Sequence, residues 1–219
     1  MLSNLYLHYT FDRWLSKHYP HIPWCRYADD GLLHCGTQAE AEQLLAALDA
    51  RFQECGLTLH PEKTRIVYCK DGKRRGNAEE VGFDFLGYTF RQRPCASRDG
   101  TRLFMGFNPA MSKGALKSIR LKIKGLRVPR CTGMSLEGLA QWLNPMVTGW
   151  FNYYGRYHRS ALYAINRHLN KILVKWARRK YKSLRRHKTR AMQFMEGIAR
   201  QSPGLFAHWR IMGRAGAFV

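Results

Sequence analysis

The sequence has 219 residues, of which 45% are hydrophobic and 13% aromatic, and its formal net charge at pH 7 is +22. This composition supports a buried core and excludes a chain that is disordered throughout. No run approaches the roughly 18 uninterrupted apolar residues of a membrane span, and the N-terminus lacks the pattern of a secretory signal. We therefore expect a soluble, cytoplasmic protein with no membrane partner. The six cysteines form no C-x-x-C pair and no zinc-like alternation with the nine histidines, so we expect reduced thiols.

The positive charge is confined to the second half of the chain. Residues 1–110 carry 14 Lys and Arg against 13 Asp and Glu, whereas residues 111–219 carry 23 against 2. A charge that only improved solubility would be spread along the chain with mixed signs. A surplus in one half is expected of a protein that binds a polyphosphate, and interleaved aromatic residues point to nucleic acid.

The first predicted elements are a helix over residues 2–17 and two short strands over residues 24–35. Leu5, Tyr9, Phe11 and Trp14 lie near one face of the helical repeat, which Pro20 and Pro23 end. The strands enclose the dipeptide Asp30-Gly31, a pair that favours tight hairpin turns. Asp29 and Asp30 are then expected at or near a hairpin tip.

The adjacent carboxylates of Asp29 and Asp30 are the most chemically informative feature of the chain. Two like charges side by side repel unless a cation offsets them, and hard oxygen ligands suit Mg²⁺ or Mn²⁺. Such a pair is typical of two-metal phosphoryl transfer. The alternative is a solvated turn, because Asp and Gly are ordinary turn residues.

A helix and further strands are predicted up to residue 108. Thr37 and Glu40 form a capping box for a helix that ends near Cys55, with Leu44, Leu45, Leu48 and Phe52 on its buried face. We expect a strand to start at residue 57 and lead into residues 61–68, followed by a solvated loop over 70–80. A strand over 83–90, interrupted by Gly87, and a strand over 101–107 then form a small hairpin.

From Ser112 onwards the pattern changes to basic helices, so we place a domain boundary near Asn108 and Pro109. Apolar stripes predict helices over 112–126, 136–151 and 160–182, and a short helix around 192–199. On the first and third of these, basic residues repeat at helical spacing away from the apolar stripe and are expected to face solvent. The predicted RNA-binding residues are Lys113, Lys117, Arg120, Lys124, Arg167, Lys171, Lys175, Arg178 and Arg179.

Four motifs occur in the order found in group II intron reverse transcriptase/maturases. Tyr27-Ala28-Asp29-Asp30 resembles the catalytic palm tetrapeptide, Leu59 to Ile66 resembles the next palm motif, and Phe85-Leu86-Gly87-Tyr88 resembles the primer-grip strand. Gly149-Trp150-Phe151-Asn152-Tyr153-Tyr154 and the basic helix ending in Trp176 resemble the maturase-specific thumb segment. The resemblance implies an α+β fold. It consists of a partial polymerase palm of antiparallel strands with helices over 1–108, an all-helical basic thumb or maturase-specific domain over 109–190, and a C-terminal tail over 191–219.

The resemblance also implies roles for individual residues. Asp29, Asp30 and Tyr27 are catalytic, with Asp29 as the Mg²⁺ ligand and Asp30 as the neighbouring carboxylate. Lys63 faces the triphosphate, and Phe85, Leu86, Gly87 and Tyr88 support the primer. The implied cofactor is Mg²⁺ or Mn²⁺, and the implied partners are structured intron RNA, an RNA template with a DNA primer, and deoxynucleotide triphosphates. The oligomeric state stays open.

The family also places a metal-binding aspartate on an earlier strand. Asp12 is the only carboxylate before Asp29, and it lies in a helical pattern, so we do not assign it that role. We expect this chain to be the later part of a larger protein and not to extend a primer by itself. Three hypotheses follow: RNA-directed DNA synthesis, an RNA-binding splicing cofactor without chemistry of its own, and a generic DNA-binding helical protein. The third leaves the palm-like first half unexplained.

Overall fold

A computed structural model describes residues 2–76, 78–97 and 99–212. By its internal contacts the chain forms two compact units. The first comprises Met1–Cys69 and Gly76–Val81, and the second comprises Lys70–Arg75 and Gly82–Val219. No helix in the described ranges is long and apolar enough to cross a membrane.

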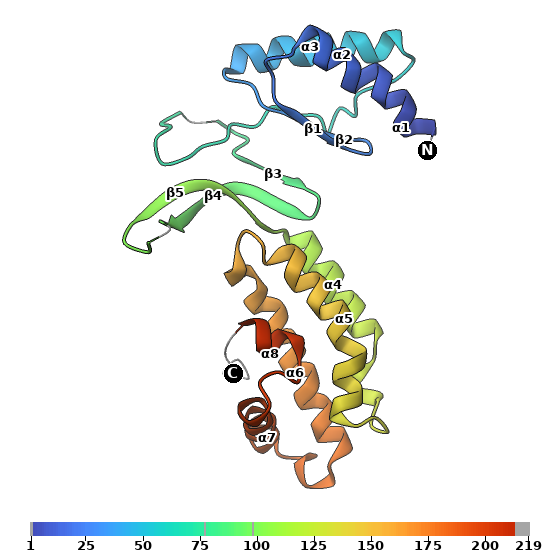
Figure 1. The fold of residues 1–219 in the computed structure, drawn as a ribbon, viewed down its shortest axis with the longest axis vertical. Helices are drawn as coiled ribbons and strands as arrows, with labels where there is room; N and C mark the ends of the chain where they lie inside the picture. Colours follow the sequence, from blue (N-terminus) through green and yellow to red (C-terminus); the bar gives the residue numbers. More distant parts are fainter. Residues whose placement is uncertain (1, 77, 98, 213–219) are drawn as a thin grey trace. The chain divides into compact units, whose positions relative to one another are not determined.

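The first unit combines a β hairpin with helices on both sides of it in sequence. α1 (Leu2–Leu7), the π-helical turn η1 (His8–Asp12) and α2 (Arg13–His18) follow one another without a break. They lead into β1 (Trp24–Tyr27), β2 (Asp30–Leu33) and α3 (Gln38–Glu54) (Figure 1). The buried core of this unit consists of Phe11, Leu15, Ile22, Leu44 and Leu48.

The predicted helices of the first unit are confirmed, with one error in the buried face. Thr37 caps α3 by accepting a hydrogen bond from the Glu40 N–H, as the capping box predicted. Leu5 and Tyr9, however, are each 56% exposed, so they do not share the buried face of Phe11. The reason is the helical repeat itself: at 3.6 residues per turn, Tyr9 and Phe11 are about 200° apart around the helix, so they lie on opposite faces.

The strand predicted over residues 57–59 and 61–68 is wrong. Pro61 has no N–H to donate, and the N–H groups of Lys63 and Thr64 both donate to the His60 carbonyl, which makes a turn. Further along, the Tyr68 N–H donates to the Glu80 carbonyl at 2.9 Å, and in the described ranges no ladder extends this contact into a strand. Leu59 still packs against the core, which explains the strand-like apolar pattern.

The second unit begins with an antiparallel sheet of β3 (Gly82–Phe85), β4 (Tyr88–Ala96) and β5 (Leu103–Met111), in the order β3-β4-β5. Leu86 and Gly87 form a two-residue turn, and Phe85 pairs with Tyr88 across it. Both turn residues have positive φ, 49° and 77°, as a tight hairpin turn requires. Gly87 therefore joins two strands, whereas we expected it to interrupt one.

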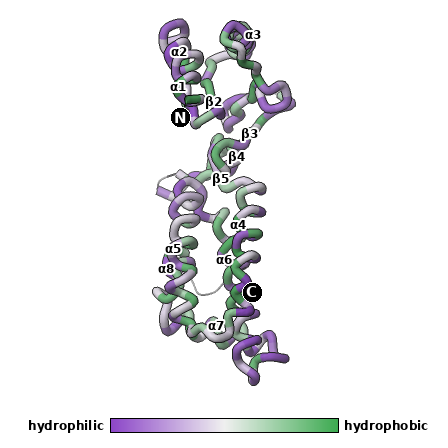
Figure 2. The backbone as a smooth tube through the Cα atoms, turned by 90° about the vertical axis from the view of Figure 1, so that its right-hand side faces the viewer, coloured by the Kyte–Doolittle hydropathy of each residue, from purple (hydrophilic) through white to green (hydrophobic). Residues whose placement is uncertain are grey.

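A helical bundle follows the sheet in the second unit. Its elements are α4 (Lys113–Gly125), η2 (Val128–Arg130), α5 (Leu136–Tyr154), η3 (Arg159–Leu162), α6 (Tyr163–Lys180), η4 (Lys182–Leu184), α7 (Lys188–Gln201) and α8 (Ala207–Met212). Ser112 and Ser135 cap α4 and α5 by accepting hydrogen bonds from Ala115 and Gly138 N–H groups. The alternation of hydrophobic and hydrophilic residues along these helices is visible in Figure 2. The apolar residues predicted for α6, from Leu162 to Trp176, are all buried.

The α+β class with a helical second part is confirmed, but the fold does not divide at the predicted residues. β5 runs through Asn108 and Pro109 to Met111 in register with β4, so no structural boundary lies there. Residues 191–212 form no separate tail, because Met195 of α7, Phe206 just before α8 and Trp209 of α8 are buried in the bundle core. The assignment of functional domains to 1–108, 109–190 and 191–219 stays a prediction.

Candidate nucleic-acid interface and hairpin carboxylates

Asp29 and Asp30 lie at the tip of the β1–β2 hairpin, as predicted, but the turn is not the expected Asp-Gly pair. Tyr27 pairs with Asp30, so Ala28 and Asp29 form the turn, and Ala28 has φ 55°. Gly31 lies in β2, where an added Cβ would come 3.1 Å from the Phe11 ring. Tyr27, Asp29 and Asp30 are all exposed, with Tyr27 at 64%.

An ion pair lies next to the turn of this hairpin. The Arg26 guanidinium donates two hydrogen bonds to the Asp12 carboxylate, at 2.7 and 2.6 Å, and a third to the Ala28 carbonyl at 2.6 Å. The side chains of Arg26 and Asp12 are only 12% and 14% exposed. Hydrogen bonding from Arg26 is the main reason that the pKa of Asp12 is lowered. Asp12 therefore positions the turn that carries Asp29.

The chemistry of the hairpin tip fits a divalent cation. Two adjacent, exposed carboxylates offer the hard oxygen atoms that Mg²⁺ and Mn²⁺ prefer. Among the described residues, no cluster of three or more Asp, Glu, His or Cys side chains is placed to hold a metal ion. Lys63 is exposed and lies in the turn that follows His60.

The four residues predicted for the primer grip lie at the β3–β4 turn and pack against the end of α5. Tyr88 is buried, and its hydroxyl donates to the Tyr153 carbonyl, so its side chain is engaged inside the protein. The Tyr153 hydroxyl donates to the Leu86 carbonyl at 2.8 Å, and an added Cβ on Gly87 would lie 2.9 Å from the Tyr154 hydroxyl. Phe85 is half-buried, and Leu86 is 37% exposed.

Two of the predicted basic helices, α4 and α6, pack against each other and carry exposed charges. Lys113, Lys117, Arg120 and Lys124 are exposed on α4, and Arg167, Lys171, Lys175 and Arg179 are exposed on α6. His168 lies between them: its pKa is lowered first by burial and then by the charges of Arg120, Lys175 and Lys171. Side chains from both helices therefore raise the positive potential at one place. We call this the α4–α6 basic face, made by Arg120, Lys171 and Lys175.

The helical spacing predicted that Arg178 faces solvent, and this prediction is wrong. Arg178 is half-buried, and its guanidinium donates twice to the Arg185 carbonyl, at 3.3 and 3.2 Å. This carbonyl lies in the turn after η4, where the chain folds back towards α7. The turn after η4 thus supplies a hydrogen-bond acceptor that the helical spacing of α6 alone could not predict.

Sequence reasoning missed His168. Its spacing of three and seven residues from Lys171 and Lys175 places it on the same side of the helix, which is the signal that could have identified it. Its Nε2 atom is buried and has no hydrogen-bond partner among the described residues. His168 therefore lies partly buried between the two helices, where a positive charge on its own ring would be unfavourable.

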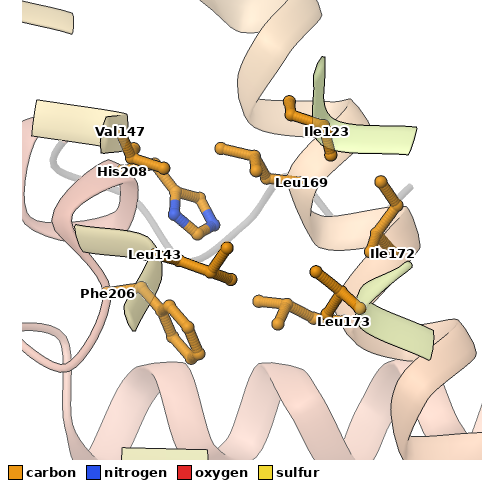
Figure 3. Close-up of a pocket in the computed structure, with 9 residues that line it drawn as sticks. Ile123, Leu143, Val147, Leu169, Ile172, Leu173, Phe206 and His208 are labelled. Carbon is orange, nitrogen blue, oxygen red and sulfur yellow. The ribbon is translucent and has the colours of Figure 1, made fainter. Parts of the chain in front are cut away.

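The small cavity of the bundle has no catalytic character. Its volume is about 10 Å³, roughly one water molecule, and His208 is the titratable residue among its apolar lining residues (Figure 3). A cavity of this size excludes a nucleotide, so it belongs to the packing of the core.

Comparison with known families agrees with this organisation. The reverse transcriptase (RNA-dependent DNA polymerase) family model matches residues 1–90, and the model of the group II intron, maturase-specific domain matches residues 116–194. No curated protein matches the chain. The first match contains the hairpin carboxylates, and the second contains α6 and most of α4. Members of these families bind nucleic acid, and reverse transcriptases use a divalent metal ion. The two matches occur in the order predicted from the motifs, and together with the fold they show that the chain belongs to the group II intron reverse transcriptase/maturases, a family of RNA-directed DNA polymerases.

Proposed function

We propose that the second unit binds structured intron RNA through the α4–α6 basic face and that Asp29 and Asp30 contribute to RNA-directed DNA synthesis. The observation that carries the RNA-binding part is that Arg120, Lys171 and Lys175 are exposed on two helices, α4 and α6, that pack against each other. Folded RNA is recognised largely by its shape and by its phosphate and 2′-hydroxyl groups, because its deep groove hides the base edges. A rigid face with several cations suits such a ligand.

The proposed catalytic role uses the exposed hairpin tip. Asp29 and Asp30 would hold Mg²⁺ or Mn²⁺ through their carboxylate oxygens, and Arg26 with Asp12 would keep the turn in place. When bound, the ion would help activate the primer 3′-hydroxyl and stabilise charge on the departing pyrophosphate. Tyr27 would lie near the primer end or nucleotide, and the ammonium group of Lys63 would face the triphosphate. The proposed substrates are an RNA template with a DNA primer and deoxynucleotide triphosphates.

The RNA-binding proposal is tested by reversing charge on one face. Replacing Arg120, Lys171 and Lys175 with Glu should weaken binding of a folded intron RNA and flatten its dependence on salt. The control replaces Lys182, Arg186 and Lys188 with Glu, which changes the net charge equally at exposed sites beyond α6. Equal losses in both variants would mean that attraction is general and that the α4–α6 basic face is not the binding surface.

The catalytic proposal is tested by primer extension on an RNA template with Mg²⁺ and deoxynucleotides. Upstream palm and fingers are fused to the chain or supplied in trans, because we do not expect the chain alone to extend a primer. Asp29→Ala should abolish any synthesis that the protein supports, while Glu54→Ala, an exposed carboxylate on α3, should leave it unchanged. The concentration of charge in residues 111–219 favours a second candidate, an RNA-binding splicing cofactor without chemistry. Tight RNA binding together with synthesis that is absent or insensitive to Asp29 would support that candidate over the first.

A further inference from the structure

A second exposed surface combines aromatic rings with positive charge and lies outside the α4–α6 basic face. It consists of Tyr153 and Tyr157, near the end of α5, together with the exposed Arg156 between them in sequence. We call it the tyrosine–arginine surface. Tyr153 and Tyr157 are 46% and 60% exposed, although both belong to a ring cluster. The β3–β4 turn lies against this cluster through the bond from the Tyr153 hydroxyl to the Leu86 carbonyl.

The buried Tyr88 ring packs against both exposed rings and holds them in place. The buried Tyr88 ring contacts Tyr153 and Tyr157 with centroid distances of 5.1 and 5.6 Å, and Tyr157 meets it edge-on at 78°. Burial and these neighbouring phenols raise the pKa of Tyr88 to about 12, in agreement with a tightly packed cluster. A ring that is fixed before binding loses little conformational entropy when a ligand stacks on it.

Positive charge surrounds these rings. Arg156 is exposed and acts electrostatically on Tyr88, in the centre of the cluster. Arg93 of β4 is half-buried, and its guanidinium donates to the Thr89 and Asn108 carbonyls at 3.3 Å each. Its charge adds to burial in lowering the pKa of His158, the residue after Tyr157. Arg156 is therefore the exposed cation of this surface, and Arg93 adds positive charge behind it. Aromatic rings with flanking cations are the features that bind unpaired nucleotides, since every base has a face that can stack.

We propose that the tyrosine–arginine surface binds an unpaired nucleotide of a nucleic-acid strand, with the base stacked on Tyr157 and the phosphate facing Arg156. The proposal rests on the proposed function in taking nucleic acid as the ligand, but it assigns a separate surface to a separate part of that ligand. The α4–α6 basic face would hold folded, paired RNA. The tyrosine–arginine surface would give a preference for RNA that carries a single-stranded extension.

The test compares two RNA probes by fluorescence anisotropy with the full chain. One probe is a blunt hairpin, and the other is the same hairpin with an unpaired extension of five nucleotides. The wild type should prefer the extended probe. Tyr157→Ala should reduce that preference by about 10-fold, the loss expected for one base–aromatic stack, and should bind the blunt hairpin within about two-fold of wild type. Tyr157→Phe keeps the ring and should keep the preference.

Matched variants separate this proposal from general RNA binding. Tyr163→Ala removes a tyrosine that is 51% exposed at the start of α6, and it should change neither probe's affinity. Arg156→Gln should also reduce the preference, which keeps the test valid if Tyr157→Ala disturbs the ring cluster. Charge reversal on the α4–α6 basic face should weaken both probes equally. A wild type that binds both probes alike, or a Tyr157→Ala protein with the full preference, would overturn the proposal while leaving the proposed function intact.

Discussion

His208 should make the bundle sensitive to acid, and the structure fixes the sign of the effect. The Trp209 indole N–H donates to the Asn170 Oδ1 atom at 2.9 Å, so the atom shared with His208 must be an acceptor. His208 Nε2, also 2.9 Å from this oxygen, therefore carries the proton. The other ring nitrogen, Nδ1, is buried and has no hydrogen-bond partner among the described residues. It lies beside Leu143, Val147, Phe206 and other apolar side chains (Figure 3).

Protonation of Nδ1 would place an imidazolium in this apolar setting. Burial accordingly lowers the pKa of His208 from 6.5 to about 3. The neutral ring contributes stability that is fully present above the unfolded pKa of 6.5 and is lost as the pH falls below it, towards the folded pKa. Each pH unit in that window is worth about 1.4 kcal/mol, so acidification from pH 7 to pH 5 should cost about 2 kcal/mol through this residue.

The assay is urea unfolding followed by circular dichroism at pH 7 and pH 5. His208→Gln, which retains an N–H donor, and His208→Phe should each lose about 2 kcal/mol less than the wild type between the two pH values, whatever their absolute stability. His187→Gln, at an exposed histidine before α7, is the control and should match the wild type. If both His208 variants keep the wild-type pH dependence, the assignment of a neutral, buried His208 is wrong.

Three further predictions concern the stability of each unit, and each is made for a single residue within one unit. Asp12→Asn should destabilise the first unit by about 2 kcal/mol, because it leaves the Arg26 guanidinium without its charged partner, whereas Glu54→Gln, in an exposed pair, should cost less than about 0.5 kcal/mol in urea unfolding. Gly87→Ala should lower the melting temperature more than Gly100→Ala does. Both glycines have positive φ, but only at Gly87 would the added Cβ collide with a neighbouring atom, the Tyr154 hydroxyl. Ser112→Ala should lower the free energy of unfolding by about 1 kcal/mol through loss of the α4 cap, and an equal stability would show that the cap contributes nothing.

The parts of the fold that the sequence predicts best are those fixed by local chemistry. Thr37 with Glu40 marked the start of α3, and the apolar repeat from Leu162 to Trp176 marked the buried face of α6, because caps and 3.6-residue spacing act within a few turns. The errors lie where a contact distant in sequence decides. Arg178 finds a carbonyl at Arg185, and Gly31 is required by the Phe11 ring, twenty residues earlier, rather than by the hairpin turn.

The same distinction applies to the candidate sites. The charge excess after residue 111 identified α4 and α6 from the sequence, since exposed lysines and arginines at helical spacing need no tertiary information. It could not show that the two helices share a face, because that depends on how α4 packs against α6. The structure supplies this information, since α4 and α6 are in contact.

The motif Phe85-Leu86-Gly87-Tyr88 shows why a family motif and a contact surface need not be the same set of atoms. Tyr88 is buried beneath Tyr153 and Tyr154, and Gly87 is the residue whose missing side chain leaves room for the Tyr154 hydroxyl. These two residues pack the sheet against α5, so substituting either one would first disturb this packing contact. The accessible groups around it are the edge of Leu86 and the rings of Tyr153 and Tyr157, which the hidden residues hold in position. A loss of nucleic-acid binding on changing Gly87 or Tyr88 is therefore informative only when Tyr157→Phe and Tyr157→Ala are measured beside it. These two variants separate the loss of a ring that contacts the nucleic acid from the loss of packing between the sheet and α5.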